Sequence, residues 1–485
     1  MVASFETMVN SIGMASYRPT IGLEIHAELT TETKMFCASK NDPDETRPNV
    51  NICPICMAHP GTLPVINRKA VEHVLRVGAA VGGTLADFTE FDRKSYFYPD
   101  IPKGYQISQY EHPLVAGGEL AGVAITRIHL EEDTARSSHA GGVSLVDFNR
   151  AGVPLMELVT EPVMHDAETA GNFARELQLL LRTLGASHAN LEKGEMRVEA
   201  NISIAPEGSS ALGTKVEVKN LNSFRAVERA IAYEIDRQTK LLESGEAVAQ
   251  ETRGWDEHKQ STFRQRVKEG SADYRYFPEP DLPKLVLSEI PEFGMDKLRA
   301  SLPELPAARR ARYAEQGVGK DAIAYIASDA DRSAFFDAVM GELKNERDAV
   351  LLAANYFSSD IAGWLAKDPS RACTLLPSAY AKLIGMIQSN QVSSRGAKEV
   401  LRGMLETGGD PESLAKAGGF EQVSDPEALR AAIKAMLQRE AKVAEEYRGG
   451  KESALQYLVG QGMKDTRGAG NPAIIKSLIQ EELAG

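Results

Sequence analysis

The hydrophobic pattern changes from strand-like to helical after the Pro-rich segment that ends at residue 283. This change constrains the fold more than any other feature of the sequence. Up to about residue 295, apolar and polar residues alternate in strand-like segments such as 20–29 and 196–204, separated by Gly and Pro turns. From Gly294 to about Leu405, apolar residues recur at helical spacing instead. A turn at 408–411 begins a last block of short helices. We therefore predict a mixed α and β domain, an all-helical domain and a small helical tail.

Three helices are expected within the N-terminal domain. Apolar positions recur every three or four residues in segments that end near a glycine, at 68–81, 167–184 and 223–242. These helices are too few and too irregularly placed for a repeating βαβ array. The fold class is therefore α+β.

Length and composition are those of a globular protein that does not enter membranes. The chain has 485 residues, 43% of them hydrophobic, which corresponds to about three domains at roughly 150 residues each. It has no apolar stretch as long as the roughly 20 residues needed to span a bilayer. Its first 20 residues contain Glu6 and lack the apolar segment of a secretory signal peptide. Four cysteines are too few for a disulfide scaffold. We expect a cytoplasmic location and no membrane partner.

The net charge restricts how the chain could bind nucleic acid. Lys plus Arg is 55 against 68 Asp plus Glu, a net charge of -13, so any RNA must be bound by a local patch. One basic stretch lies near the C-terminus and contains Arg448, Lys451, Lys464, Arg467 and Lys476. A phosphate-binding patch and a solvated helix face explain this stretch equally well.

Several acidic residues occupy positions that favour burial. The alternation in 21–29 places Glu24, His26 and Glu28 on one strand face. Glu132 is in phase with apolar neighbours, Glu157 lies inside an apolar run, and Glu199 is a further candidate on a later strand. Buried carboxylates need cations, which either arginines or a shared metal could supply. Carboxylates with one imidazole suit Mg²⁺ or Mn²⁺, which points to phosphoryl transfer.

A cationic loop could meet the phosphates, although the known phosphate-binding loop motifs are missing. Arg93, Lys94 and Lys103 lie among aromatic residues in 91–105, and such cations can neutralise a transferring phosphoryl group. A surface loop pinned by tyrosines would have the same spacing.

The cysteines suggest a second metal site. Cys53 and Cys56 form Cys-x-x-Cys, with Cys37 upstream and His59 three residues downstream. This set suits zinc. A redox pair is the alternative, but no thioredoxin-like βαβ pattern surrounds it.

Eight long segments together resemble one family, GatB of the tRNA-dependent amidotransferase GatCAB. They are IGLEIHAEL, KMFC, CPICMAHPGTLPVIN, FDRKSYFYPDIPKGYQISQ, RIHLEED, SLVDFNRAGVPLMELVTEP, VEVKNLNSF and VKEGSADYRYFPEPDLP, in the family's order. The resemblance spans the whole chain. It implies a cradle domain built on antiparallel sheet with flanking helices (1–295), a helical domain (296–405) and a tail that meets tRNA (406–485).

The resemblance also implies an activity. The family belongs to a carbon–nitrogen ligase that uses ATP and Mg²⁺ to convert Glu-tRNA(Gln), Asp-tRNA(Asn) or both into the amidated aminoacyl-tRNA through an acyl phosphate. Its amido donor is glutamine, from which the partner amidase GatA releases ammonia; the small protein GatC completes the heterotrimer. GatB carries the kinase and transamidase steps.

Family residues carry over onto positions of this sequence. The implied Mg²⁺ ligands are Glu24, His26, Glu132, Glu157 and Glu199, where many relatives have Asp at the last position. Lys94 and Lys103 are candidates for phosphate contact or for lining the ammonia route, and Tyr96 for orienting the acceptor end. The family's zinc set lacks one thiol here, because Ser39 replaces the second cysteine. Either zinc is lost, or a side chain such as His59 completes Cys37, Cys53 and Cys56.

Two other functions are alternatives. A non-catalytic tRNA-binding scaffold would share the tail, but it gives no reason for buried carboxylates. A self-sufficient amidase is disfavoured, because no Ser-Ser-Lys signature is visible and Cys373 has no histidine nearby in the sequence.

Overall fold

The computed structural model describes residues 16–267, 274–368, 375–422, 426–466 and 470–484. The chain separates into two compact units, one ending at Leu305 and one beginning at Pro306. None of the helices in the described ranges is long and apolar enough to cross a membrane.

The first unit is built on a ten-stranded sheet with the order β15-β14-β13-β12-β1-β11-β8-β6-β2, in which β7 also pairs with β8. Among these pairs only β13 with β14 is parallel. The strands of this sheet are β1 (Tyr17–Glu28), β2 (Thr84–Leu85), β6 (Val115–Ala116), β7 (Glu119–Leu120), β8 (Val123–Glu132), β11 (Pro154–Thr160), β12 (Met196–Pro206), β13 (Val216–Leu221), β14 (Glu251–Asp256) and β15 (Ser261–Val267). The α+β fold class and its antiparallel sheet are confirmed.

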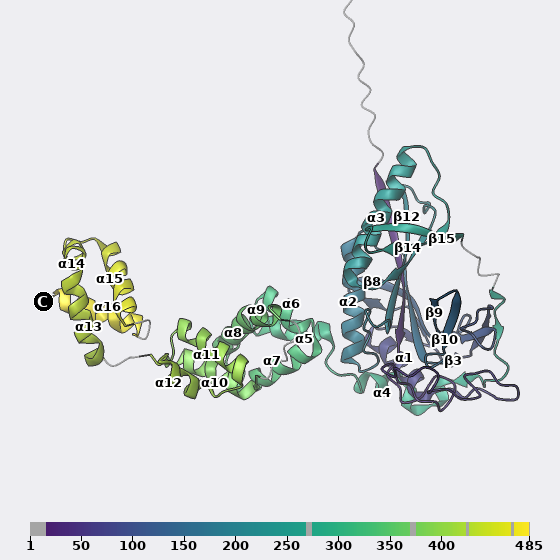
Figure 1. Cartoon of the computed structure of the whole chain (residues 1–485), viewed down its shortest axis with the longest axis horizontal. Coiled ribbons are helices and arrows are strands. Elements are labelled where there is room, and N and C mark those ends of the chain that lie inside the picture. The colour runs from purple at the N-terminus through teal and green to yellow at the C-terminus, as the bar shows by residue number, and fades with distance from the viewer. Residues whose placement is uncertain (1–15, 268–273, 369–374, 423–425, 467–469, 485) are drawn as a thin grey trace, which may run out of the picture. The chain divides into compact units, whose positions relative to one another are not determined.

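One face of this sheet is apolar and is covered by helices. On β1, Ile21, Leu23 and Ile25 are buried in a core shared with α1 (Arg68–Ala80), α2 (Ala167–Thr183) and α3 (Phe224–Glu243). Figure 1 shows α2 and α3 along one side of the sheet. Because side chains alternate along a strand, the polar residues between these apolar ones face the other side.

The three helices begin where side chains cap their free amides. Asn67, Asp166 and Ser223 each accept hydrogen bonds from backbone N–H groups in the first turn of α1, α2 and α3. Such caps set the helix start. The expected helices at 68–81, 167–184 and 223–242 are therefore confirmed to within one residue at each end.

Smaller sheets complete the first unit. A three-stranded sheet has the order β16-β4-β5, while β9 pairs with β10 and β3 with β17. Their bounds are β3 (Phe88–Thr89), β4 (Asp92–Ser95), β5 (Tyr105–Ser108), β9 (Arg136–Ala140), β10 (Val143–Asp147), β16 (Phe277–Pro278) and β17 (Leu285–Val286). The expected cationic loop thus forms the β4–β5 hairpin.

His73 makes the stability of this unit depend on pH. It is 3% exposed on α1, its Nε2 lies 3.2 Å from the carbonyl oxygen of Thr30, and burial together with Lys69 lowers its pKa to about 4. As the pH falls, the His73 ring is therefore protonated at a higher pH in the unfolded chain than in the folded one. The free energy of unfolding decreases as the pH falls from 6.5 towards 4. We expect a loss of about 2 kcal/mol between pH 7 and 5, which His73→Gln removes. Urea unfolding followed by Trp255 fluorescence, in a Trp364→Phe background, tests this; equal pH slopes in both proteins would contradict it.

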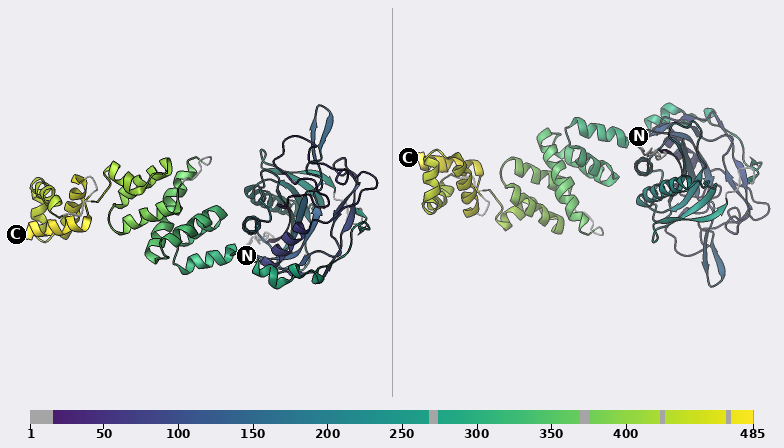
Figure 2. Two further views of the ribbon diagram at one scale, coloured as in Figure 1. Left: turned by 90° about the horizontal axis from the view of Figure 1, so that it is seen from below. Right: turned by 90° about the horizontal axis from the view of Figure 1, so that it is seen from above.

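The second unit is helical. Short connections join α5 (Pro306–Glu315), α6 (Lys320–Ala327), α7 (Ala330–Glu342), α8 (Arg347–Tyr356), η4 (Phe357–Ile361), α9 (Ala362–Ala366), α10 (Pro377–Gln388), α11 (Ser394–Thr407), α12 (Pro411–Gly418), α13 (Pro426–Arg439), α14 (Ala441–Arg448), α15 (Glu452–Asp465) and α16 (Pro472–Ala484). Figure 2 shows these helices in green to yellow. They enclose two apolar cores, one within 313–420 and one within 429–483.

Two helices pack into the core of the preceding domain, although the sequence pattern assigns them to the domain that follows. Leu298 of α4 (Met295–Ala300) packs into the core of the sheet, and Ala415 of α12 packs into the core of the preceding helices. Turn residues mark where an element ends, but burial decides which domain it joins. The proposed boundaries at 295 and 405 therefore lie before these two helices.

Candidate active site

The polar face of the sheet brings together residues from four neighbouring strands. In register, His26 on β1 lies opposite Glu157 on β11, and Glu157 lies opposite His129 on β8. Glu24 lies opposite Glu199 on β12. Since directly opposite residues share a face, the strand pairing alone creates a row of carboxylates and imidazoles.

Three carboxylates converge on one imidazole nitrogen. His26 Nε2 lies 3.4 Å from Glu157 Oε2, 3.7 Å from Glu131 Oε1 and 3.8 Å from Glu24 Oε1. Ligand atoms of Glu24, His26 and Glu157 lie within 4.8 Å of one another, and so do those of His129, Glu131 and Glu157, so two overlapping sets that share Glu157 could hold an ion. We call Glu24, His26, Glu131 and Glu157 the acid cluster.

Burial makes the charges of the acid cluster strongly interdependent. Glu131 and Glu157 are 2% and 5% exposed. Burial and the charge of Glu157 raise the pKa of Glu24 to about 7. Burial opposes protonation of His26, but the hydrogen bond and charge of Glu157 prevail and raise its pKa to about 9. The buried acids therefore require positive charge. Arg127 Nη2 lies 3.7 Å from Glu157 Oε1 and supplies part of it, and protons or a divalent cation could provide the rest.

His129 is a member of this site that sequence reasoning missed. Its ring is 3% exposed, and its Nε2 lies 3.3 Å from the same Glu157 oxygen that faces His26. Burial raises the pKa of Glu157, but the charges of His129 and His26 and their hydrogen bonds outweigh it and hold that pKa well below its usual range. The available signal was the alternation of Arg127, His129 and Glu131 along one strand.

Glu132 lies on the opposite side of β8 from the acid cluster. It shares its strand phase with Leu130, whereas Glu131 shares the phase of His129 and faces His26. Glu132 Oε1 instead lies 2.5 Å from Lys103 Nζ and accepts a hydrogen bond from the Ile107 amide at 2.9 Å. Among the described residues, the groups that could hold a metal include Glu131 and omit Glu132. Strand alternation thus separates the two adjacent glutamates.

Glu199 has its own cation at the border of the acid cluster. Lys219 Nζ lies 2.5 Å from Glu199 Oε2, and Glu24, Glu199 and Glu217 bring ligand atoms within 4.8 Å of one another. The structure therefore places Glu199 beside Glu24 but already paired.

Alternation also separates Arg93 from Lys94. Arg93 donates two hydrogen bonds to Glu279, of 2.7 and 2.8 Å, and a third to Asp281, so its charge is already used in holding β4. Lys94 lies on the other face of β4, with Gln106 directly opposite. Burial lowers the pKa of Lys94, but electrostatic interactions with Glu131, Tyr276 and Glu157 outweigh it and raise that pKa above its ordinary value. Lys94, and not Arg93, thus interacts electrostatically with the acid cluster.

Tyr96 is tied to the same hairpin. Its hydroxyl donates a 3.4 Å hydrogen bond to Gln106 Oε1, and Gln106 Nε2 donates to the carbonyl oxygen of Glu132 at 2.6 Å. Burial raises the pKa of Tyr96, so this phenol remains a hydrogen-bond donor at neutral pH.

Lys103 lines a separate cavity of about 280 Å³. The walls of this cavity include Lys103, Glu132, Tyr105, Cys37 and Cys56. Lys94 and Lys103 therefore lie in different surroundings: Lys94 faces the acid cluster, and Lys103 faces the cavity on the other side of the β4–β5 hairpin.

Comparison with known proteins identifies the family. The GatB/GatE catalytic domain model matches residues 19–290, and the GatB domain model matches residues 334–483. The chain belongs to the GatB family.

Its relatives match nearly end to end. It is 43% identical to the chloroplastic/mitochondrial B subunit of the glutamyl-tRNA(Gln) amidotransferase of Physcomitrium patens, over 97% of this chain and 86% of the relative. It is 42% identical to the B subunit of the aspartyl/glutamyl-tRNA(Asn/Gln) amidotransferase of Synechococcus sp. (strain JA-2-3B'a(2-13)), over 97% and 98%.

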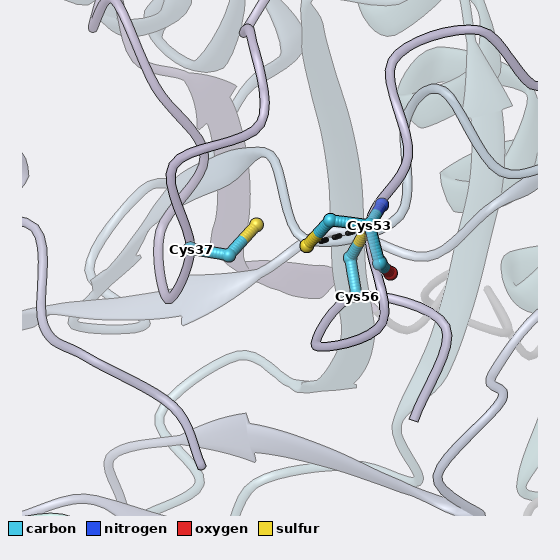
Figure 3. A group of neighbouring side chains, drawn as sticks. All are labelled: Cys37, Cys53 and Cys56. Atoms are coloured by element: carbon cyan, nitrogen blue, oxygen red, sulfur yellow. Dashed lines mark hydrogen bonds between the residues drawn. The ribbon is translucent and has the colours of Figure 1, made fainter. Parts of the chain in front are cut away.

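The thiols of this GatB family member gather as a zinc site would require. The sulfurs of Cys37, Cys53 and Cys56 lie within 4.8 Å of one another, and Figure 3 shows the Cys53 and Cys56 side chains together with Cys37 facing them. Cys53 and Cys56 sulfurs are 3.9 Å apart, close to the roughly 3.8 Å expected between ligands 2.3 Å from tetrahedral zinc. Three corners of a zinc site therefore fit.

Among the residues that the structure describes, none adds a fourth metal ligand to the three thiols. Ser39 Oγ lies 3.9 Å from the Cys56 sulfur, and Lys34, which is fully buried, places its Nζ 3.8 Å from the same sulfur. His59 lines the neighbouring cavity but is not part of the three-thiol group. Zinc at this site remains a proposal.

The basic tail residues differ in how far they are already paired. Arg448 contacts Glu445 at 2.6 Å, and Lys451 contacts Glu446 at 2.7 Å. Lys464 on α15 and Lys476 on α16 are exposed and have no ion-pair partner among the residues that the structure describes. Arg467, like Cys373, lies outside the described residues.

Proposed function

We propose that this chain is the GatB component of an ATP- and glutamine-dependent amidotransferase. It converts Glu-tRNA(Gln), Asp-tRNA(Asn) or both into the amidated aminoacyl-tRNA, as the names of its relatives indicate for those proteins. The single observation that carries the chemistry is the convergence of three buried or half-buried carboxylates on His26 Nε2. A scaffold that only binds tRNA would have no use for this cluster.

The residues fit a divalent cation. Glu24, His26, Glu131 and Glu157 would hold Mg²⁺, which neutralises charge on the ATP phosphates when it is bound. We propose Glu131 as a ligand in place of Glu132, and Glu199 as a neighbour of the ligands. The charges of Glu131 and Glu157 act on Lys94, and we propose that Lys94 contacts the transferring phosphoryl group.

Two steps follow from this arrangement. A carboxylate oxygen of the aminoacyl group attacks the γ-phosphorus of ATP, and the bond to ADP breaks, which leaves an acyl phosphate. Ammonia then attacks the acyl carbon, inorganic phosphate leaves and the amide forms. Tyr96 would orient the acceptor end. The chain's contribution is to position these groups and to keep water out.

The Lys103–Glu132 pair fits the second step better than the first. Both residues line the cavity of about 280 Å³ on the far side of the hairpin from Lys94. A small cavity with Lys103 and Glu132 in its wall suits a small polar molecule such as ammonia. We therefore propose that Lys103 and Glu132 line the ammonia route, and that the amidase GatA supplies the ammonia within a heterotrimer that also contains GatC.

The reaction is tested by reconstitution. The chain assembled with GatA and GatC is incubated with glutamine and each misacylated tRNA, with and without ATP and Mg²⁺. Amidated aminoacyl-tRNA should form only when ATP and the divalent cation are present. Assembly without ATP-dependent amidation of either tRNA would leave only the scaffold function.

The tail should contribute affinity for tRNA. Deletion of residues 426–485 removes the last apolar core as a whole, together with the exposed Lys464 and Lys476, and leaves the other cores intact. We expect the complex to bind tRNA at least tenfold more weakly, because phosphate contacts dominate such affinity, and to keep hydrolysing glutamine. Filter binding at two salt concentrations measures this; unchanged tRNA affinity would remove the tail from the binding surface.

A further inference from the structure

Five tyrosines form a continuous chain of ring contacts beside the acid cluster. Neighbouring ring centroids are 5.9, 6.1, 6.2 and 4.4 Å apart along the series Tyr98, Tyr96, Tyr274, Tyr276 and Tyr110. These residues come from the end of β4, the end of β5 and the segment before β16. Three stretches of chain thus cooperate to place aromatic rings at one location.

The chain of rings borders the charges that would perform phosphoryl transfer. Lys94 Nζ lies 5.2 Å from the centroid of Tyr274. Burial raises the pKa of Tyr276 to about 12; Lys94 opposes this shift, and Glu131 adds to it. Two residues before Tyr110, Ser108 donates a 3.1 Å hydrogen bond to Glu131. A molecule lying on these rings could therefore reach the acid cluster.

The two ends of the ring chain differ in geometry. Tyr110 is 46% exposed and stacks on Tyr276 with an interplanar angle of 15°. Tyr98 is 53% exposed but meets Tyr96 edge-on at 62°. Offset-parallel stacking is a favoured arrangement of flat rings, and a third planar ring can continue such a stack on its free face. Of these two ends, the Tyr110 end has this arrangement.

We propose that Tyr110, supported by Tyr276, stacks the adenine ring of a substrate nucleotide whose reactive end reaches the acid cluster. This inference rests on the proposed function. Both substrates of the first step carry adenine, because ATP contains it and every tRNA ends in adenosine at the 3′ position. Aromatic side chains are common platforms for unpaired bases, because every base presents a flat face. Lys94, whose Nζ lies 5.2 Å from the Tyr274 ring and which interacts electrostatically with Glu131 and Glu157, could meet a phosphate or an aminoacyl carboxylate there.

The test compares Tyr110→Ala, Tyr110→Phe and Tyr98→Ala in the complex with GatA and GatC. Tyr110→Ala should raise one Michaelis constant by roughly 5- to 100-fold, given the usual strength of base stacking. A higher KM for ATP identifies the nucleotide, and a higher KM for tRNA identifies the terminal adenosine. Tyr110→Phe keeps the ring and should stay within about twofold, as should Tyr98→Ala.

Equilibrium binding separates this inference from the proposed function. ATP alone, and an RNA acceptor stem with or without its terminal adenosine, are titrated into wild-type and Tyr110→Ala complexes. Loss of the adenine-dependent part of binding in the variant supports stacking even if amidation fails. Unchanged binding and KM values would overturn it, as would an effect of equal size in Tyr98→Ala. Protection of Tyr110 from hydroxyl-radical labelling in the substrate-free complex would also overturn it, because GatA or GatC would then cover the ring.

Discussion

Replacing Glu157 by Gln is expected to lower ATP-dependent amidation at least 100-fold, because the substitution removes the charge on which the acid cluster is organised. Glu157 Oε2 lies 3.4 Å from His26 Nε2 and 3.3 Å from His129 Nε2. Loss of one preorganised charged group at a reacting centre typically costs about two to three orders of magnitude. The neutral amide would also weaken divalent cation binding.

Two measurements isolate this effect from general damage to the fold. Mn²⁺ binding followed by paramagnetic resonance should weaken at least tenfold in Glu157→Gln, because a ligand charge is lost. Binding of tRNA should stay close to wild type, because the basic tail residues belong to a separate compact unit. Wild-type amidation by the Glu157→Gln complex would remove the metal-assisted mechanism and favour the scaffold alternative.

Glu131→Gln and Glu132→Gln are expected to impair different steps although the residues are adjacent. Glu131 Oε1 lies 3.7 Å from His26 Nε2, so its neutralisation should weaken Mn²⁺ binding at least tenfold and slow ADP formation about 100-fold. Glu132 pairs with Lys103 on the other face of β8, so its neutralisation should leave Mn²⁺ affinity within about twofold. The two isosteric variants serve as controls for each other.

The affected step is read from the products. In Glu131→Gln, ADP and amide should decline together, because the acyl phosphate does not form. In Glu132→Gln, ADP formation should continue and amide formation should decline, with acyl phosphate lost to water. Equal loss of Mn²⁺ binding in both variants would show that Glu132 is also a ligand and would contradict the separation by strand phase.

Local rules were enough to predict much of the fold. The α+β class and three helices followed from periodicity and from glycines near the helix ends, because these signals depend on neighbours within a few positions. The domain boundaries were harder to predict from the sequence, because α4 and α12 follow turn signals yet pack into the preceding cores. A turn ends an element, whereas its burial depends on residues far away in the sequence.

For the candidate site, the sequence determined the chemical inventory: carboxylates and imidazoles on strands, lysines among tyrosines, and three thiols. The tertiary structure decided which members meet. Pairing of β1, β11 and β8 placed Glu131 beside His26 and His129 beside Glu157, and it turned Glu132 towards Lys103. It also committed Arg93 to Glu279 and left Lys94 near the acids. The physical reason is that alternation fixes only which residues of one strand share a face, while register and packing between distant strands fix what that face meets.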